Sequence, residues 1–144
     1  MRLFIIFFLL LFLSLSANAE IPIIQLKVSD YNILAEVAYK KKYRIQGLMH
    51  RDTLDRDSGM LFVFPEINHH SMWMVNTYIP LSIAFLDQEG IIINIFDMMP
   101  LTKTKYSATS KAKYALEMNL GWFSSRNIQP GKKIIGLENA PKAE

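Results

Sequence analysis

The stretch from residue 81 to residue 96 reads LSIAFLDQEGIIINIF, and it decides the fold class. Its two apolar runs, Leu81–Asp87 and Ile91–Phe96, are rich in β-branched and aromatic residues, as strands are. Asp87 can accept main-chain N–H bonds at the start of a type I turn, and Gly90 can adopt the left-handed conformation that rejoins the ladder. The stretch therefore predicts a β-hairpin. Side-chain alternation places three of its residues on one face: Leu81, Ile83 and Phe85.

Short apolar runs of the same kind recur along the chain and end at Gly, Pro, Asn or Asp, which is the pattern of β-strands. The further predicted strands are Ile23–Val28, Ile33–Ala38, Met60–Phe64, Met72–Val75, Tyr114–Met118 and Lys133–Leu137. Short strands at this spacing predict a mainly β fold, a single antiparallel β-sandwich or barrel. We expect one domain over residues 20–144, in which residues 137–144 form a frayed polar tail.

Two short helices are predicted between the strands. The first covers about Lys40 to Leu48, and its Lys40-Lys41-Lys42 start places positive charge where the helix dipole favours negative charge. This helix start is therefore weakened, or it faces an anionic surface such as a membrane. The second helix covers about Leu120 to Arg126, with Asn119 as its N-cap and Asn127 in the left-handed conformation at its end.

The first nineteen residues have the pattern of a secretory signal peptide. Arg2 precedes the unbroken apolar run from Leu3 to Leu15, and the small residues before Glu20 end in Ala-x-Ala. As a helix this run covers about 20 Å, less than the roughly 30 Å hydrocarbon core of a bilayer. We predict cleavage after Ala19 and export to the periplasm or the extracellular space, with no transmembrane segment after cleavage. The alternative is an uncleaved N-terminal anchor.

Composition excludes several other classes of protein. The chain is 51% hydrophobic and 20% charged, which argues against intrinsic disorder. It has no cysteine, which excludes a disulfide scaffold, a thiolate metal site and a cysteine nucleophile. From Glu20 onward it has 15 basic and 13 acidic residues, too even a balance for a nucleic-acid-binding protein. We expect no cofactor.

The segment 72–80, MWMVNTYIP, mixes bulky apolar and polar side chains. As a strand it would place Met72, Met74 and Asn76 on one face and Trp73 on the other. Asn76 and Thr77 then offer hydrogen-bonding groups for the floor of a polar pocket. The alternative is that these two residues satisfy main-chain groups while Trp73 fills the core.

Arg51 is a further candidate, because it precedes a loop that is rich in aspartate and turn residues. Its guanidinium group could bind a carboxylate ligand through two hydrogen bonds, or it could fix its own loop to a carbonyl or a neighbouring acid. The candidate ligand-binding residues are Arg51, Trp73, Met74, Asn76 and Thr77.

These features favour a non-enzymatic envelope module that binds a small polar ligand or a protein partner. The chain lacks a Gly-x-Ser-x-Gly elbow, a His-Glu-x-x-His motif and a Gly-rich phosphate loop. One alternative is a hydrolase with a site near Arg51, Asn76 and Asp97. A second is a copper-handling protein, because the run from His69 to Met74 contains the imidazole and thioether ligands that copper accepts. We identify no catalytic residue and no metal ligand.

Several motifs carry a resemblance to a known family: Gly47-Leu48-Met49-x-Arg51, Gly59-Met60-Leu61-Phe62-x-Phe64, Trp73-Met74-x-Asn76-Thr77-x-Ile79-Pro80 and Tyr114-x-Leu116-Glu117. The chain resembles the domain of unknown function 192 family, DUF192, over roughly residues 33–137. The resemblance implies a compact, jelly-roll-like β domain that is commonly exported in bacteria, is also found in archaea and has no established activity. The sequence departs from the usual pattern at Lys40-Lys41-Lys42 and at Asn127.

Overall fold

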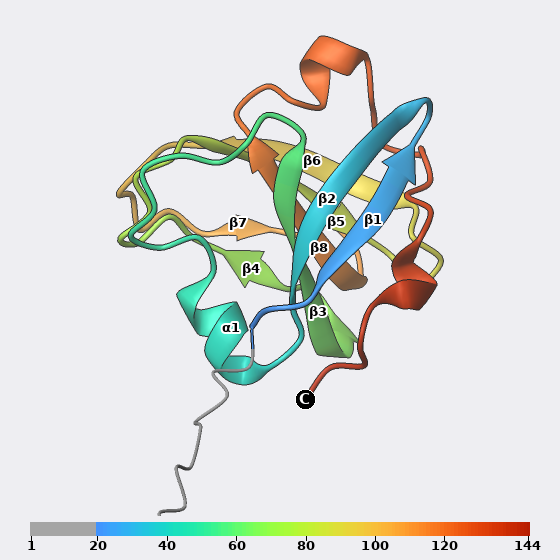
Figure 1. Ribbon diagram of the computed structural model, residues 1–144, viewed down its shortest axis with the longest axis horizontal. Helices are drawn as coiled ribbons and strands as arrows, with labels where there is room; N and C mark the ends of the chain where they lie inside the picture. Colours follow the sequence, from blue (N-terminus) through green and yellow to red (C-terminus); the bar gives the residue numbers. More distant parts are fainter. Residues whose placement is uncertain (1–19) are drawn as a thin grey trace, which may run out of the picture.

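The computed structural model describes residues 20–144, so the predicted signal peptide lies outside the described residues. One six-stranded sheet, with the order β1-β2-β3-β8-β5-β6, forms the body of the domain (Figure 1). Its strands are β1 (Ile23–Val28), β2 (Tyr31–Ala38), β3 (Ser58–Asn68), β8 (Ala112–Asn119), β5 (Leu81–Leu86) and β6 (Ile92–Met98). A second sheet contains only β4 (Ser71–Met72) and β7 (Tyr106–Ser107). The mainly β class is confirmed, but a sandwich of two comparable sheets is not.

The predicted hairpin is present as β5 and β6, which pair antiparallel. Asp87 closes its turn, because one carboxylate oxygen accepts the main-chain N–H groups of Glu89 and Ile91, each at 2.9 Å. Gly90 has φ +86°, as the turn requires. Leu81, Ile83 and Phe85 all lie in the same core cluster, which confirms the predicted alternation of the strand.

The sheet is not wholly antiparallel, which corrects the prediction. β2 and β3 run parallel, with Glu36 beside Met60 and Ala38 beside Phe62. A parallel pair needs a crossover connection that is longer than a hairpin turn. The helix α1 (Lys41–Gln46) and the loop that follows it provide this connection.

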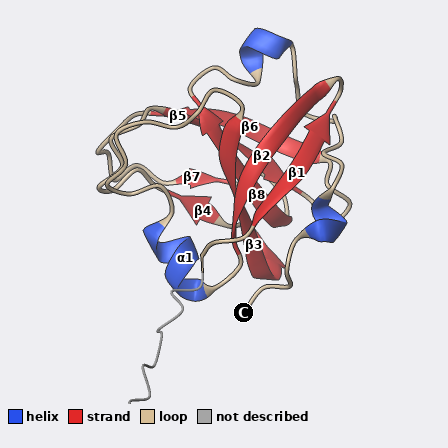
Figure 2. Ribbon diagram, in the orientation of Figure 1, coloured by secondary structure: helices blue, strands red, loops and turns tan. Residues whose placement is uncertain are grey.

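Apolar clusters cover both faces of the large sheet. One cluster includes Val37, Leu116 and the C-terminal residues Trp122 and Phe123. The other includes Phe62, Ile83 and Phe85 of the sheet, together with Tyr43, Leu48, Met74 and Ile79 from α1 and the loops. The helices and the small sheet thus lie around the large sheet (Figure 2). This arrangement explains why every residue of β5 is buried.

The segment 131–136 contacts both edge strands of the sheet. It exchanges hydrogen bonds with Ile92 of β6, and Ile135 exchanges two with Lys27 of β1, at 2.8 and 3.0 Å. In Figure 1 this C-terminal part of the chain runs along the side of β1. The predicted strand Lys133–Leu137 is therefore present only as isolated bridges, and the curled sheet is not a closed barrel.

The two predicted helices are only partly present. α1 begins at Lys41 without a side-chain cap, as its unfavourable first turn suggests. At the second position there is a single 3-10 turn, Ser124–Arg126, which Asn127 ends in the predicted left-handed conformation. Asn119 does not cap this turn, because the turn begins only at Ser124, with Phe123 as its N-cap residue. The side-chain amide of Asn119 donates to the carbonyls of Leu54 and Asp55. In residues 20–144 there is no helix long and apolar enough to cross a membrane.

The last residues, expected to fray, are held against the domain. Leu137–Asn139 forms a second 3-10 turn, and Ala140 and Ala143 pack against a core cluster. The main-chain N–H of Glu144 donates to the carbonyl of Tyr39 at 2.8 Å, and Arg44 donates to the carbonyl of Glu144 at 2.7 Å. A cationic side chain of α1 therefore anchors the C-terminal residue.

Candidate functional site

A cavity of about 230 Å³ lies between the end of α1, the turn after β4 and one face of the large sheet. Its walls include Gly47, Met49, Met72, Trp73 and Thr77, and Glu117 contributes its acidic group. We call this space the Glu117 cavity. It is smaller than the roughly 300–1,000 Å³ typical of pockets for drug-sized ligands, so it is suited to a smaller molecule.

Glu117 lies in the middle of the sheet. It is in β8, with Met60 of β3 and Ile83 of β5 directly beside it. These neighbours belong to the apolar cluster beneath the cavity, and only 3% of Glu117 is exposed. Within residues 20–144 its carboxyl group has no hydrogen-bond or ion-pair partner. No fully buried side-chain oxygen or nitrogen of the described residues lacks a hydrogen-bond partner, so the carboxyl oxygens of Glu117 keep a small accessible surface, and Glu117 lines the cavity. An acid that is nearly buried in a mainly apolar wall still calls for an explanation.

Burial raises the pKa of Glu117 to about 8, because the apolar surroundings disfavour the charged carboxylate. At pH 7 the side chain is therefore mostly the neutral acid. In this form it can donate one hydrogen bond, whereas the carboxylate can only accept them. The cavity thus contains one titratable group that changes both its charge and its hydrogen-bonding role near neutral pH.

Gly47 shapes the wall beside α1. It ends the helix with φ +47° and ψ −134°, and its N–H donates to the carbonyl of Tyr43 at 2.8 Å. A Cβ at this position would lie 3.3 Å from the ring of Phe62. Both the conformation and the space therefore favour glycine.

Trp73 lines the cavity and is not in the core, which overturns the alternative in which its indole fills the core. It is 48% exposed, because β4 ends at Met72 and the chain then turns, with the N–H of Thr77 donating to the carbonyl of Met74. Of the predicted strand Met72–Val75, only Met72 therefore lies in a strand. The turn leaves the indole at the surface beside the cavity.

The neighbouring candidates have different positions. Thr77 is buried in the cavity wall, and its hydroxyl donates to the carbonyl of Val75 at 3.1 Å. Met74 is fully buried in the core cluster. Asn76 is exposed with φ +52°, its carbonyl accepts the N–H of His50, and it does not line the cavity.

Arg51 lies outside the cavity. Its guanidinium group binds both carboxylate oxygens of Glu36 in β2, at 2.5 and 3.0 Å. The pair lines a separate groove that also includes Ile23 and Leu34. The two hydrogen bonds that Arg51 could offer to a carboxylate ligand are thus made to Glu36 of the same chain.

The residues of the predicted hydrolase site do not converge. Asp97 accepts a hydrogen bond from the hydroxyl of Ser82 at 2.6 Å, and these two residues line a pocket with Phe123. Ser82 alternates with Ile83, so this pocket lies on the face of the sheet opposite to Glu117. Arg51 and Asp97 are therefore on opposite faces.

The histidines and methionines of the predicted copper site are also dispersed. The ring of His69 donates to the carbonyl of Ala108 at 3.2 Å, and that of His70 donates to the carbonyl of Glu66 at 2.7 Å. His70 also stacks on Phe64, with ring centroids 3.8 Å apart, while Met74 is buried. Over residues 20–144 no three His, Asp or Glu side chains are grouped as metal ligands.

Comparison with known proteins identifies the family of this chain. The model of the family DUF192, described as "Uncharacterized ACR, COG1430", matches residues 24–136. The chain belongs to the DUF192 family. The match includes the residues of the Glu117 cavity and all of the six-stranded sheet except Ile23.

Two solved structures are similar to this DUF192 domain. One is a protein from Sinorhizobium meliloti for which a role as a transcription regulator has been suggested; it has a TM-score of 0.80 and 29% identity, over 83% of this chain and 97% of that one. The other is a protein of unknown function from Novosphingobium aromaticivorans, with a TM-score of 0.78 and 27% identity, over 83% of this chain and 89% of that one. Comparison with curated proteins gives no match.

Glu117 is the member of this DUF192 site that sequence reasoning missed. The motif Tyr114-x-Leu116-Glu117 was recognised, but no role was given to the acid. A signal was present, because Glu117 follows Ala115 at strand spacing and so falls on a buried face of an otherwise apolar strand. A buried acid at such a position indicates either a partner or a site.

Proposed function

We propose that this DUF192 domain is an exported, non-enzymatic module that binds a small molecule in the Glu117 cavity. The observation that carries the proposal is the Glu117 carboxyl group, which is buried, borders a cavity and has no partner within the described residues. The fold keeps this nearly buried acid among apolar groups, at a desolvation cost that a bound ligand would offset.

The cavity is suited to binding rather than to catalysis. An acid–base or nucleophilic mechanism needs at least two reactive groups that converge on one point. The other charged residue of the cavity wall is Arg44, and its guanidinium group donates to the carbonyls of Tyr39, Val63 and Glu144. It is therefore committed to holding the main chain, and Glu117 is the one acid of the wall.

Export is supported by the sequence of residues 1–19, which has a basic start, an apolar run and an Ala-x-Ala end. Expression of the full chain in a bacterium, followed by cell fractionation and N-terminal sequencing, tests this part. We expect the protein in the periplasm or the medium, with Glu20 as its first residue. A cytoplasmic product that begins at Met1 would overturn it.

A fragment screen tests the binding role. We expect small ligands that raise the melting temperature of the purified protein and change the NMR shifts of the Gly47 and Thr77 amides in the cavity wall. The amide of Gly90, in the turn between β5 and β6 and outside the cavity wall, serves as the internal reference and should not change. A screen without hits, or with hits whose shift changes centre elsewhere, would contradict the proposal.

A further inference from the structure

Among the described residues, the wall of the Glu117 cavity has an acid but no available cation. Arg44, the cationic residue of this wall, donates to three carbonyls, and the nearby Arg51 pairs with Glu36. The ammonium group of Lys113 donates to the carbonyl of Phe64 at 2.6 Å. A positive charge that complements Glu117 would therefore have to come from the ligand.

The remaining cavity walls are mainly apolar. Leu48 and Phe62 are buried, and Met49 and Met72 are partly buried, at the wall. These side chains can cover a short hydrocarbon body. Trp73 stands at the same wall with half of its surface exposed, and an indole is the aromatic group that attracts cations most strongly.

The size of the cavity limits the ligand. A volume of about 230 Å³ equals the liquid volume of about seven or eight water molecules. A short alkylammonium ion fits this space, whereas a nucleotide or a folded peptide does not. An ammonium group also offers three N–H donors to an acceptor-only carboxylate.

From these observations we propose that the Glu117 cavity binds a small primary ammonium compound with a short apolar body, whose ammonium group pairs with the Glu117 carboxylate. This inference rests on the proposed binding function and names the class of ligand. The pair forms between a charged amine and an ionised acid. At pH 7, where Glu117 is mostly protonated, binding therefore releases its proton to the buffer.

The pH dependence of binding follows from the groups around Glu117. From α1 these are Arg44 and the buried Tyr43; from β2 it is Glu36, which is neutralised by Arg51. From β3 and β5 the neighbours Met60 and Ile83 carry no charge. Glu117 is therefore the group that titrates near neutral pH, and affinity for an ammonium ion should rise from pH 6 to pH 8.

Isothermal titration calorimetry with n-butylammonium chloride, n-butanol and sodium butyrate tests the inference, because the three probes share one body and differ in charge. We expect the ammonium ion to bind about tenfold to a hundredfold more tightly than the alcohol, the range of a charge-assisted hydrogen bond, and butyrate not to bind. Titrations in buffers of different ionisation enthalpy should report proton release at pH 7.

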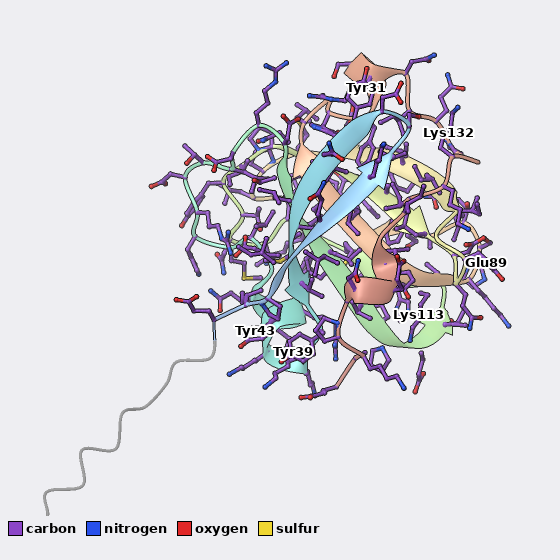
Figure 3. All side chains as sticks on the ribbon, turned by 45° about the vertical axis from the view of Figure 1, so that its right-hand side comes forward. Tyr31, Tyr39, Tyr43, Glu89, Lys113 and Lys132 are labelled. Carbon is purple, nitrogen blue, oxygen red and sulfur yellow. The ribbon has the colours of Figure 1, made fainter. Side chains whose placement is uncertain are left out.

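Glu117→Gln should lose the preference for the ammonium ion. Glu89→Gln is the matched control, because Glu89 lies in the hairpin turn, far from Tyr43 and α1 (Figure 3), and should bind as the wild type does. If Glu117→Gln does not fold, the proton release and pH dependence of the wild type still decide the question.

The outcomes separate this inference from the proposed function. Equal or tighter binding of n-butanol or butyrate, or ammonium binding without proton release, would overturn the ligand class and leave the binding function standing. If none of the three probes binds while the fragment screen still finds cavity ligands, the class is again wrong. If the screen also fails, both proposals fall.

Discussion

Glu36 and Glu117 lie in one row across the sheet, with Met60 between them, and of these two acids only Glu36 has a cationic partner within the described residues. Their side chains are on the same face, because directly paired residues of neighbouring strands point the same way. The Arg51 guanidinium neutralises Glu36, whereas Glu117 borders the cavity alone. The two acids therefore have different roles: one holds the crossover loop, and the other is available to a ligand.

The stability of the protein should decrease as the pH rises from about 4.5 to about 8. Burial raises the folded-state pKa of Glu117 from 4.5 to about 8, so in this range the folded protein binds more protons than the unfolded chain. The loss of unfolding free energy reaches about 5 kcal/mol at most, at about 1.4 kcal/mol for each pH unit between the two pKa values.

Urea unfolding of the wild type and of Glu117→Gln at several pH values measures this effect. A glutamine amide does not titrate, so the unfolding free energy of Glu117→Gln should lack this dependence on pH. The unfolding free energy of Glu89→Gln should retain it. Parallel pH profiles for wild type and Glu117→Gln would show that the acid is not desolvated in the folded protein.

Arg51→Ala should destabilise the fold by about 1–2 kcal/mol, because it leaves the partly buried Glu36 without its cation. Ligand binding in the Glu117 cavity should be unchanged, since Arg51 lines a different groove. A double-mutant cycle with Glu36→Gln isolates the pair, and we expect a coupling energy of about 1 kcal/mol. A loss of ligand affinity in a folded Arg51→Ala protein would restore Arg51 as a binding residue.

Gly59→Ala should be strongly destabilising, by about 3 kcal/mol or more. A Cβ at Gly59 would overlap the main-chain carbonyl oxygen of Glu117 and the sulfur of Met118, and the main chain of a central strand cannot move away easily. Ser58→Ala, one residue earlier, adds no atom and should cost less than about 1 kcal/mol. Thermal unfolding of both variants checks the difference, and similar melting temperatures would contradict the close approach of β3 and β8.

The two tryptophans should differ in their fluorescence. Trp73 is 48% exposed, whereas Trp122 is 3% exposed and donates a hydrogen bond to Asp57. Acrylamide should therefore quench one component of the emission readily, and Trp73→Phe should remove that component with little loss of stability. A bound cavity ligand should protect Trp73 from the quencher. Equal quenching of the wild type and Trp73→Phe would show that the indole is buried.

The sequence was a good guide to local structure. The turn residues Asp87 and Gly90 and the alternation in β5 predicted the hairpin, because both signals arise from neighbouring residues. The left-handed Asn127 was predicted for the same reason. The parallel pairing of β2 and β3 was not predicted, because the residue pattern of a strand does not show which strand it pairs with or in which direction.

The candidate site could be predicted only in part. Trp73 and Thr77 do line the cavity. The strand expected at 72–75 would place the indole of Trp73 on the face opposite to Met72 and Met74, but side-chain alternation no longer applies after Met72, where the chain turns. Arg51 was a candidate for ligand binding, yet its guanidinium group pairs with Glu36 of β2, the strand that precedes α1. Glu117 was missed because its isolation depends on which side chains surround it, and that is a property of the packed sheet.

Residues 131–136 form hydrogen bonds with both edge strands of the large sheet, β1 and β6. Without this segment in place, β1 and β6 would keep unpaired edges that other polypeptides could join. The protection of both edges thus depends on a segment that follows all of the strands in the sequence. A variant that lacks residues 131–144 should therefore aggregate more readily than the full chain.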